Sequence, residues 1–443
     1  MVDSNNPLRK WALALPNNAG VSCQYEEWID SYRVFVNRDA VVPQNKGPRT
    51  KPINGPLFGT TFLVKDSIDV IGFPTTNGTV TLSSNFPSFD HSLVARLKTL
   101  GGTCVGKANL DEMSYGWASD NAYFGQVINP KFPHYSPGGS SGGCAAGVAG
   151  GAAYFAVGED TVGSLRIPAA FCGVSAYRAI STQPVTERVC PLTFSGYDQV
   201  GLIAPSLSDI SKLDSLIHDY EELPDVIPGD LSIAVAANFS LLALAPEVEA
   251  CMQDAIFKLA SVGAGIVMQE VPRSFSLAAP ALTTIVNYEF LPAFNCYLKS
   301  RVGEPTTLEQ LLQHQDTPTT HRIKALAFPP GRPTSTAYER ALDAAQRIRQ
   351  DVVDYFLNTR CQVLIHPTVA VNIAAFNIHH NALVDPIALA QHVSVAPCAQ
   401  TIAINFSVIG PEGAPVGIEM LCAPTIDARN ALAICRTIES IVK

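Results

Sequence analysis

The sequence predicts an α/β fold in which one large sheet is covered by helices on both faces. Amphipathic helical patterns alternate along the chain with short apolar segments, which is typical of strands buried between helical layers. The 443 residues are 47% hydrophobic and 16% charged, which supplies a large core and little material for disorder. The length suggests about three domains on a simple count. A single α/β unit with an inserted lobe fits it equally, and we expect one domain over residues 1–443.

Helices and strands alternate in the first part of the chain. Residues 91–100 (HSLVARLKTL) have an amphipathic helical pattern, and Gly101 and Gly102 follow it as glycine commonly follows a helix. Residues 57–70 are interpreted as a pair of strands. The other elements expected here are helices over 26–37 and from 107–113 onward, and a short buried strand over 103–106.

The same alternation continues after residue 173. Helices are expected over 206–217, 246–262, 282–299, 338–357 and 427–442, and strands over 231–236, 265–271 and 363–367. This alternation again indicates a sheet packed on both faces.

Composition also excludes several classes of protein. The net charge of −9 and the absence of any Lys/Arg cluster argue against a protein that binds nucleic acid through phosphate contacts. The sequence contains no uninterrupted stretch of about 20 apolar residues, so it predicts no membrane span. The segment MVDSNNPLRKW lacks an apolar signal region. The eleven cysteines are scattered without a CxxC pair, which indicates free thiols in a reducing compartment. We therefore expect a cytoplasmic protein.

The most informative stretch covers residues 137–173. It places Ser140 inside GGSSGG and Ser164 inside DTVGS, 24 residues further along, with small residues and almost no charge between them. Gly/Ser runs are commonly flexible linkers. This run instead leads into residues 144–149 (CAAGVA), which must be buried. Glycines that flank a serine inside a core indicate close backbone approach, so we expect a serine that is held for chemistry.

These motifs resemble the signature of the amidase signature family of serine hydrolases. Its GGSS(G/S)G loop and its later GTDTGGS-(I/V)-R-(I/V/F)-P-(A/S) loop correspond to GGSSGG and GEDTVGSLRIPA. A third family motif, P-L-x-G-(I/V)-P-x-x-(I/V)-K-D, resembles PLFGTTFLVKD at residues 56–66. The resemblance implies a large, mixed, mostly parallel twisted sheet with an inserted smaller lobe. It also implies a catalytic triad of Ser164 as nucleophile, Ser140 in a cis peptide, and Lys65.

The chemistry of these residue types agrees with such a triad. A serine hydroxyl is a poor nucleophile without an adjacent base, and no histidine except His134 lies near the serine motifs. Lysine is a base only when it is neutral, and apolar surroundings such as residues 62–64 lower the pKa of a lysine. Because a hydroxyl both donates and accepts, Ser140 can pass the proton of Ser164 to Lys65. The same relay in reverse protonates the leaving amine.

A turn around the second serine is the expected oxyanion hole. The turn consists of Thr161, Val162, Gly163 and Ser164. Backbone N–H groups directed at one point stabilise the negative charge that acyl transfer places on a carbonyl oxygen. Val162 stands where most family members have glycine. Because valine is strained at positive φ, we predict a negative φ there, and we expect its branched side chain to narrow or reshape the pocket.

Other residues of these motifs are expected to support the site, and Lys65 has an alternative interpretation. The supporting residues are Gly139, Ser141, Asp160 and Arg166. The second loop also departs from the family pattern at Glu159, where threonine is common. Since lysine is rarely buried, Lys65 could instead be a surface residue at a strand end, paired with Asp66. The spacing of the three motifs favours the catalytic interpretation.

We expect no metal and no other cofactor. The pair His379–His380 followed by Asn381 suggests a metal site, but adjacent histidines do not easily share one ion, and no carboxylate pair lies at ligand spacing. Residues 107–113 resemble a K-T-N-M-D-E segment of the family and are interpreted as structural. Residues 222–330 lie outside the motifs, and we expect this lobe to cover the site. A homodimer is the default expectation for assembly.

The sequence therefore predicts a serine amidohydrolase. In this interpretation Ser164 takes the acyl group of a small carboxamide, ammonia or an amine leaves, and water hydrolyses the ester. A resemblance to indole-acetamide-type amidases favours an aryl-acetamide as substrate. One alternative is an acyltransferase or a biosynthetic amide- or ester-forming enzyme with the same triad, including a component that supplies ammonia to misacylated tRNA. A second alternative, which Val162 keeps open, is a catalytically weak binding module.

Overall fold

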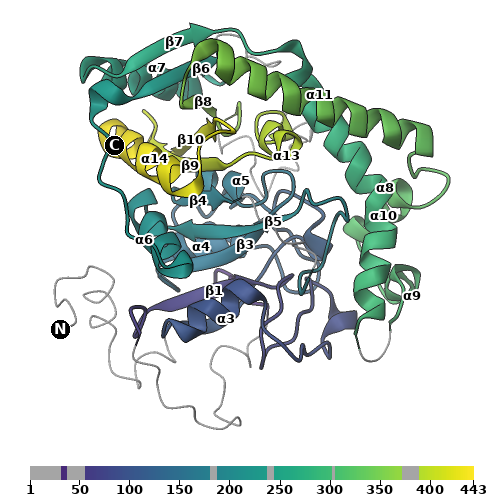
Figure 1. Ribbon diagram of the computed structural model, residues 1–443. Coiled ribbons are helices and arrows are strands. Elements are labelled where there is room, and N and C mark those ends of the chain that lie inside the picture. The colour runs from purple at the N-terminus through teal and green to yellow at the C-terminus, as the bar shows by residue number, and fades with distance from the viewer. Residues whose placement is uncertain (1–30, 37–54, 180–186, 237–243, 302–304, 372–388) are drawn as a thin grey trace.

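A ten-stranded sheet forms the centre of the protein. The computed structural model describes residues 31–36, 55–179, 187–236, 244–301, 305–371 and 389–443. Within these residues the strands lie in the order β2-β1-β3-β5-β4-β9-β10-β8-β6-β7 (Figure 1). Their bounds are β1 Thr61–Lys65, β2 Thr103–Ala108, β3 Phe155–Asp160, β4 Ser175–Arg178, β5 Gln199–Ala204, β6 Ser232–Ala236, β7 Gly265–Gln269, β8 Val363–Pro367, β9 Ala403–Ile409 and β10 Pro415–Cys422.

Most of the expected helices are present, with ends shifted by a few residues. Ser206 caps α6 through its side chain, Thr334 caps α11 in the same way, and Pro246 begins α7, as helix-start residues commonly do. The helices are α3 Ser92–Thr99, α4 Gly142–Gly150, α5 Arg166–Cys172, α6 Leu207–His218, α7 Pro246–Ser261, α8 Ala278–Lys299, α9 Leu308–Gln313, α10 Pro318–Ala327, α11 Ser335–Thr359, α13 Val395–Ala399 and α14 Ala428–Val442.

Alternate residues of the strands belong to separate hydrophobic cores on the two faces of the sheet. Phe62 and Val64 of β1 lie in the core that α3, α6, α7 and α14 build on one face, whereas Leu63 lies in the core of α4 on the other. In β9, Ile404 belongs to the first core and Ala403 to a core with α8, α11 and α13. The predicted α/β class, with helices on both faces, is confirmed.

The strand pairing is mixed, which corrects the expectation of a mostly parallel sheet. Among the described strands, β1 pairs in parallel with β2 and β3, and β6 pairs in parallel with β7 and β8. The five pairings in the middle of the sheet, from β3 through to β8, are antiparallel. Residues 410–414 alone join β9 to β10, and so short a connection returns the chain antiparallel.

Three predicted elements in the first part of the chain differ from the structure. Residues 57–70 contain one strand, β1, rather than a pair. Residues 107–113 do not begin an α-helix. Lys107 and Ala108 end β2 beside β1, where Lys107 pairs with Val64, and only a short 3-10 helix follows at Glu112–Ser114. The described part of 26–37, residues 31–36, is not helical, and the rest of that predicted helix lies outside the described residues.

The segment 222–330 contributes to the sheet as well as to a helical layer. Its strands β6 and β7 extend the sheet beyond β8, and its helix α8 packs against α10 and α11. Figure 1 shows α8, α10 and α11 in green along one side of the sheet. Among the described residues, none of the helices has the length and hydropathy of a membrane span.

Candidate active site

The fold brings Lys65 and Ser140 into contact, although 75 residues separate them in the sequence. Lys65 ends β1, and Ser140 lies just before α4. The lysine Nζ is 2.6 Å from the Ser140 Oγ, and both side chains are fully buried. The Gly139–Ser140 peptide bond is cis, as the family resemblance implied. A buried lysine is therefore placed against a serine that can exchange protons with it.

Glu159 is the second contact of this lysine. Its Oε1 lies 3.0 Å from the Lys65 Nζ, and neither side chain is exposed beyond 2%. The expected alternative partner, Asp66, instead pairs with Lys107 at 3.1 Å. Because Lys65 is fully buried and does not pair with Asp66, the interpretation as a surface lysine is excluded.

Ser164 lies in the turn that connects β3 to α5. Its carbonyl oxygen accepts a hydrogen bond of 3.1 Å from the N–H of Ser141. The Ser141 hydroxyl in turn donates to the carbonyl oxygen of Glu159 at 3.2 Å. These contacts hold the two serine loops side by side. The described residues show no direct hydrogen bond between the hydroxyls of Ser140 and Ser164, so the contact between the loops is made by Ser141.

Asp160 and Arg166 hold the shape of this turn. The Asp160 carboxylate accepts the N–H of Gly163 at 2.9 Å and that of Leu165 at 3.2 Å. Arg166 donates to the same carboxylate at 3.0 Å through two nitrogens, and to the Val393 carbonyl at 2.9 Å. Burial would raise the pKa of Asp160, but the charge and hydrogen bonds of Arg166 lower it to about 2. The turn is therefore built around a permanent carboxylate.

The backbone conformation of the turn depends on Gly163. Gly163 is left-handed, with φ +86°, and its N–H is committed to Asp160. Val162 is not among the described residues with positive φ, which confirms the predicted negative φ. Of the four residues predicted to form the oxyanion hole, Gly163 therefore has its N–H directed to Asp160.

The Val162 side chain packs toward the helices rather than into solvent. It is 7% exposed and lies in the core that contains α8 and α13. Its carbonyl oxygen accepts a hydrogen bond of 3.0 Å from the indole nitrogen of Trp117. A Cβ on the neighbouring Gly163 would lie 2.5 Å from Val393, so the packing of Val393 leaves no room for a side chain there.

Asp198 supports the turn from a distant part of the chain, a role that the sequence did not assign to it. It accepts the Thr161 hydroxyl at 2.6 Å, and the N–H groups of Leu192 and Thr193 at 3.0 and 2.9 Å. Burial, together with the nearby charge of Glu159, raises the pKa of Asp198 to about 7. Thr161 lies 37 residues upstream, so no local pattern marks the pair.

The serine loop is supported from behind by the segment that follows β2. The Ser119 hydroxyl accepts the N–H of Gly142 at 2.9 Å and donates to the Ser140 carbonyl at 3.4 Å. Asp111 accepts the N–H groups of Ala118 and Ser119, and burial raises its pKa to about 6. Residues near 107–113 reach the serine loop through Ser119 and through the Asn109 carbonyl, which accepts the N–H of Gly143 at 3.1 Å. These backbone contacts agree with the structural interpretation of this segment.

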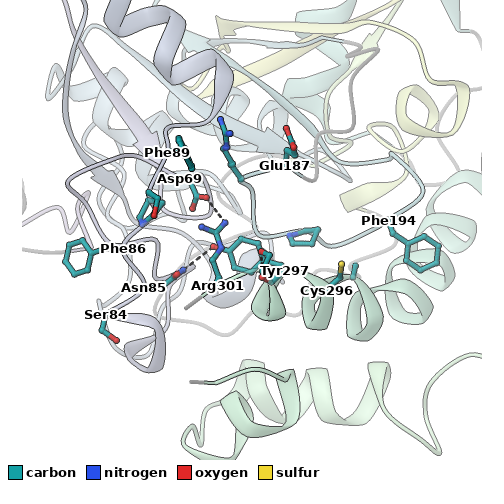
Figure 2. A pocket seen from close by; sticks show the side chains of 16 residues that line it. Asp69, Ser84, Asn85, Phe86, Phe89, Glu187, Phe194, Cys296, Tyr297 and Arg301 are labelled. Carbon is teal, nitrogen blue, oxygen red and sulfur yellow. Dashed lines mark hydrogen bonds and ion pairs between the residues drawn. The ribbon is translucent and has the colours of Figure 1, made fainter. Parts of the chain in front are cut away.

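A hollow of about 680 Å³ lies apart from these residues. Figure 2 shows its polar wall, where Arg301 pairs with Asp69 and Asn85 donates to the Tyr297 hydroxyl. The Arg301 guanidinium also lies 4.2 Å from the centre of the Tyr297 ring. None of the described residues that line the hollow belongs to the predicted triad.

The described residues contain no group of three His, Cys, Asp or Glu side chains arranged to hold a metal ion. The sequence positions considered for such a site, His379, His380 and Asn381, lie outside the described residues.

The sequence is similar to those of two groups of known proteins. A glutamyl-tRNA(Gln) amidotransferase subunit of Methanosarcina mazei is 36% identical over 266 residues, which is 55% of this chain and 55% of that protein. The match thus spans about half the length of that relative. Indoleacetamide hydrolase of Allorhizobium ampelinum is 28% identical over 396 residues, 87% of this chain and 85% of the relative.

Solved structures and a family model give the same assignment. The native peptide amidase of Stenotrophomonas maltophilia has the same fold, with a TM-score of 0.75 at 22% identity, covering 98% of this chain and 95% of that chain. The model of the Amidase family matches residues 24–429, which is most of the sequence. The chain belongs to the Amidase family.

Proposed function

We propose that this protein is an amidohydrolase that cleaves the C–N bond of a carboxamide through an acyl-enzyme on Ser164. The observation that carries the proposal is the buried contact of 2.6 Å between Lys65 and Ser140, beside the turn that holds Ser164. The Ser164 Oγ attacks the carbonyl carbon of the amide. Its proton passes to Ser140, whose own proton passes to Lys65.

The negative charge that forms on the carbonyl oxygen is stabilised by the turn. The N–H groups of Thr161, Val162 and Ser164 are the donors, and the contact between Asp160 and Gly163 keeps the turn in shape. The relay then returns its proton to the leaving nitrogen, so that ammonia or an amine departs. Water finally hydrolyses the ester on Ser164 and regenerates the enzyme.

We propose a small primary amide with an aromatic group, such as an aryl-acetamide, as substrate. The similarity to an indoleacetamide hydrolase over 87% of this chain supports this class. Aromatic side chains also belong to the core that contains Val162. Trp117 bonds to the Val162 carbonyl, and Tyr115 packs on Phe290 of α8 with ring centres 5.4 Å apart. Rings of this kind favour an aromatic acyl group through stacking and edge contacts.

Acyl transfer is the second candidate function. The similarity to part of an amidotransferase over 55% of this chain favours it. The same acyl-enzyme on Ser164 would then react with an amine rather than with water. The two functions differ only in the final nucleophile, so a competition between water and an added amine separates them.

The experiment that tests the proposal is mass spectrometry of the intact protein after reaction with a fluorophosphonate. Wild type should gain one phosphonyl group, and Ser164→Ala should gain none. Ser261→Ala, which changes an exposed serine, is the control and should label like wild type. A folded wild-type protein that does not label would contradict the proposal and favour the binding-module interpretation.

A further inference from the structure

Glu159 places a buried carboxylate directly on the lysine of the proposed triad. Its Oε1 lies 3.0 Å from the Lys65 Nζ. Its Oε2 has no hydrogen-bond partner in the described structure, so no other cation shares its charge. Glu159 is part of β3, a strand that is buried along its whole length, and it cannot turn toward solvent. The family pattern commonly has threonine at this position, so this chain has a carboxylate where the pattern has a hydroxyl.

The other charged or titratable groups near this pair do not replace Glu159. Burial raises the pKa of Asp111 and the charge of Lys65 partly lowers it, but the Asp111 carboxylate accepts its hydrogen bonds from the N–H groups of Ala118 and Ser119 and not from Lys65. Burial and the charge of Glu159 raise the pKa of Asp198 to about 7. The Asp198 carboxylate accepts hydrogen bonds from Thr161, Leu192 and Thr193 and not from Lys65.

The remaining titratable neighbours of Glu159 and Lys65 are either neutral or already paired with another charge. Lys107 is neutralised by Asp66 at 3.1 Å. Burial raises the pKa of the Cys144 thiol to about 12 and that of Cys190 well above its usual value, so both thiols are neutral. Within the described residues, Glu159 is therefore the one carboxylate in contact with Lys65.

We propose that Glu159 is a positioning residue that holds Lys65 as an ammonium ion and thereby sets the pH at which the triad becomes active. The proposal rests on the proposed role of Lys65 as base. An opposite charge within about 4–6 Å favours the charged form of a group. Only neutral Lys65 accepts a proton from Ser140, and Glu159 favours the protonated form. Reaction at Ser164 therefore begins at a higher pH than it would beside a hydroxyl.

The experiment follows the protonation of Lys65 directly. The full-length protein is labelled with lysine carrying ¹³C at the ε position, and Lys65→Met identifies the signal of Lys65. The titration midpoint of that signal is compared between wild type and Glu159→Gln, which keeps the shape of the side chain and removes the charge. The midpoint should fall by about 1–3 pH units in Glu159→Gln.

Three further variants separate the charge from the shape. Glu159→Thr introduces the common family residue and should lower the midpoint as Gln does. Glu159→Asp keeps the charge and should restore most of the wild-type midpoint. Glu412→Gln removes an exposed carboxylate in the β9–β10 connection and should leave the midpoint unchanged. If the Gln variant fails to fold, the comparison of Thr with Asp gives the same answer.

A second measurement connects the proton to the reaction. The rate of fluorophosphonate labelling of Ser164 is recorded against pH. In Glu159→Gln the acidic limb of this pH–rate profile should move to lower pH by as much as the Lys65 midpoint does. Equal midpoints and equal limbs in wild type and Glu159→Gln would overturn the inference even if Ser164 labels. A shifted midpoint without any labelling would support the ammonium part of the inference while contradicting the proposed function.

Discussion

Asp160 and Arg166 form a fully buried ion pair at 3.0 Å across the turn that carries Ser164. Arg166 also pairs with Glu419 of β10, a strand that β5, β4 and β9 separate from β3 in the sheet. Arg178 approaches the same Asp160 carboxylate at 3.5 Å. Two arginines and two carboxylates thus tie the turn to the centre of the sheet. The position of Ser164 is therefore set by long-range charge pairing as well as by its own loop.

Removal of the Asp160 carboxylate should lower the free energy of unfolding and slow the reaction of Ser164. Asp160→Asn removes one of the two carboxylates that pair with the buried Arg166, and breaking a buried pair from one side costs about 3–5 kcal/mol. The free energy of unfolding, measured in urea, should fall by that amount, and labelling of Ser164 should slow because the turn loses its support. Asp254→Asn, which breaks an exposed pair with Lys258, should change the free energy by less than about 1 kcal/mol. Equal losses in the two variants would contradict this account of the turn.

Truncation of the relay should slow the reaction without removing the nucleophile. Lys65→Ala and Ser140→Ala each remove one member of the proposed proton relay, and a positioned base contributes about 10²- to 10⁴-fold to rate. The rate constant of fluorophosphonate labelling should fall within that range in both variants. Lys212→Ala, a change at an exposed lysine, is the matched control. Wild-type labelling rates in Lys65→Ala would show that another group acts as base.

Asp198 should make stability depend on pH. Its pKa is raised to about 7 in the folded protein, so folding favours its protonated form. The stabilising contribution is complete below the unfolded value, about 3.9, and is lost as pH rises through about 7. Asp198→Asn stays neutral and keeps acceptors for Leu192 and Thr193. Urea unfolding at pH 5 and pH 8 should show that the variant gains stability relative to wild type at pH 8. A difference that is constant with pH would contradict the raised pKa.

Val162 should limit the size of the acyl group. Val162→Gly restores the common family residue and opens space beside the oxyanion turn, whereas Val162→Ala opens less. The ratio of kcat/KM for a bulky amide to that for a small amide should rise from wild type to Ala to Gly. Loss of the buried side chain should also reduce the free energy of unfolding by about 1–3 kcal/mol. An unchanged ratio in Val162→Gly would mean that Val162 faces the helices only and does not border the acyl group.

Hydrolysis and acyl transfer can be separated with one substrate. Ammonia release from a panel of primary amides is measured with and without added hydroxylamine. Hydrolysis predicts a carboxylic acid as the main product, with aryl-acetamides turned over faster than long-chain amides, and no activity in Ser164→Ala. A hydroxamate as the main product at low hydroxylamine would favour the transferase.

Several features could be predicted because local sequence controls them. The helix over 91–100 follows from its amphipathic period and from Gly101, which adopts φ +95° after it. The negative φ of Val162 follows from the sterics of a branched residue. The strand around Lys65 follows from a short apolar run, although only Thr61–Lys65 of the predicted 57–70 is extended.

Other features could not be predicted because they depend on residues distant in sequence. The helix expected from 107 does not form as an α-helix: residues 107 and 108 end strand β2, where pairing with β1 overrides the local preference for helix. The antiparallel centre of the sheet depends on which strands meet, and a family resemblance described it as mostly parallel. Local periodicity gives the type of an element but not its partner.

The sequence by itself determined the family, the α/β class and the order of the motifs that carry Lys65, Ser140 and Ser164, because short motifs and periodic patterns are local properties. Only the tertiary structure decided that Glu159 lies on Lys65, 94 residues away, and that Asp198 supports Thr161. Contacts of this kind arise when packing closes long loops and excludes water from charged groups. Their energies depend on burial and distance, which no stretch of sequence contains.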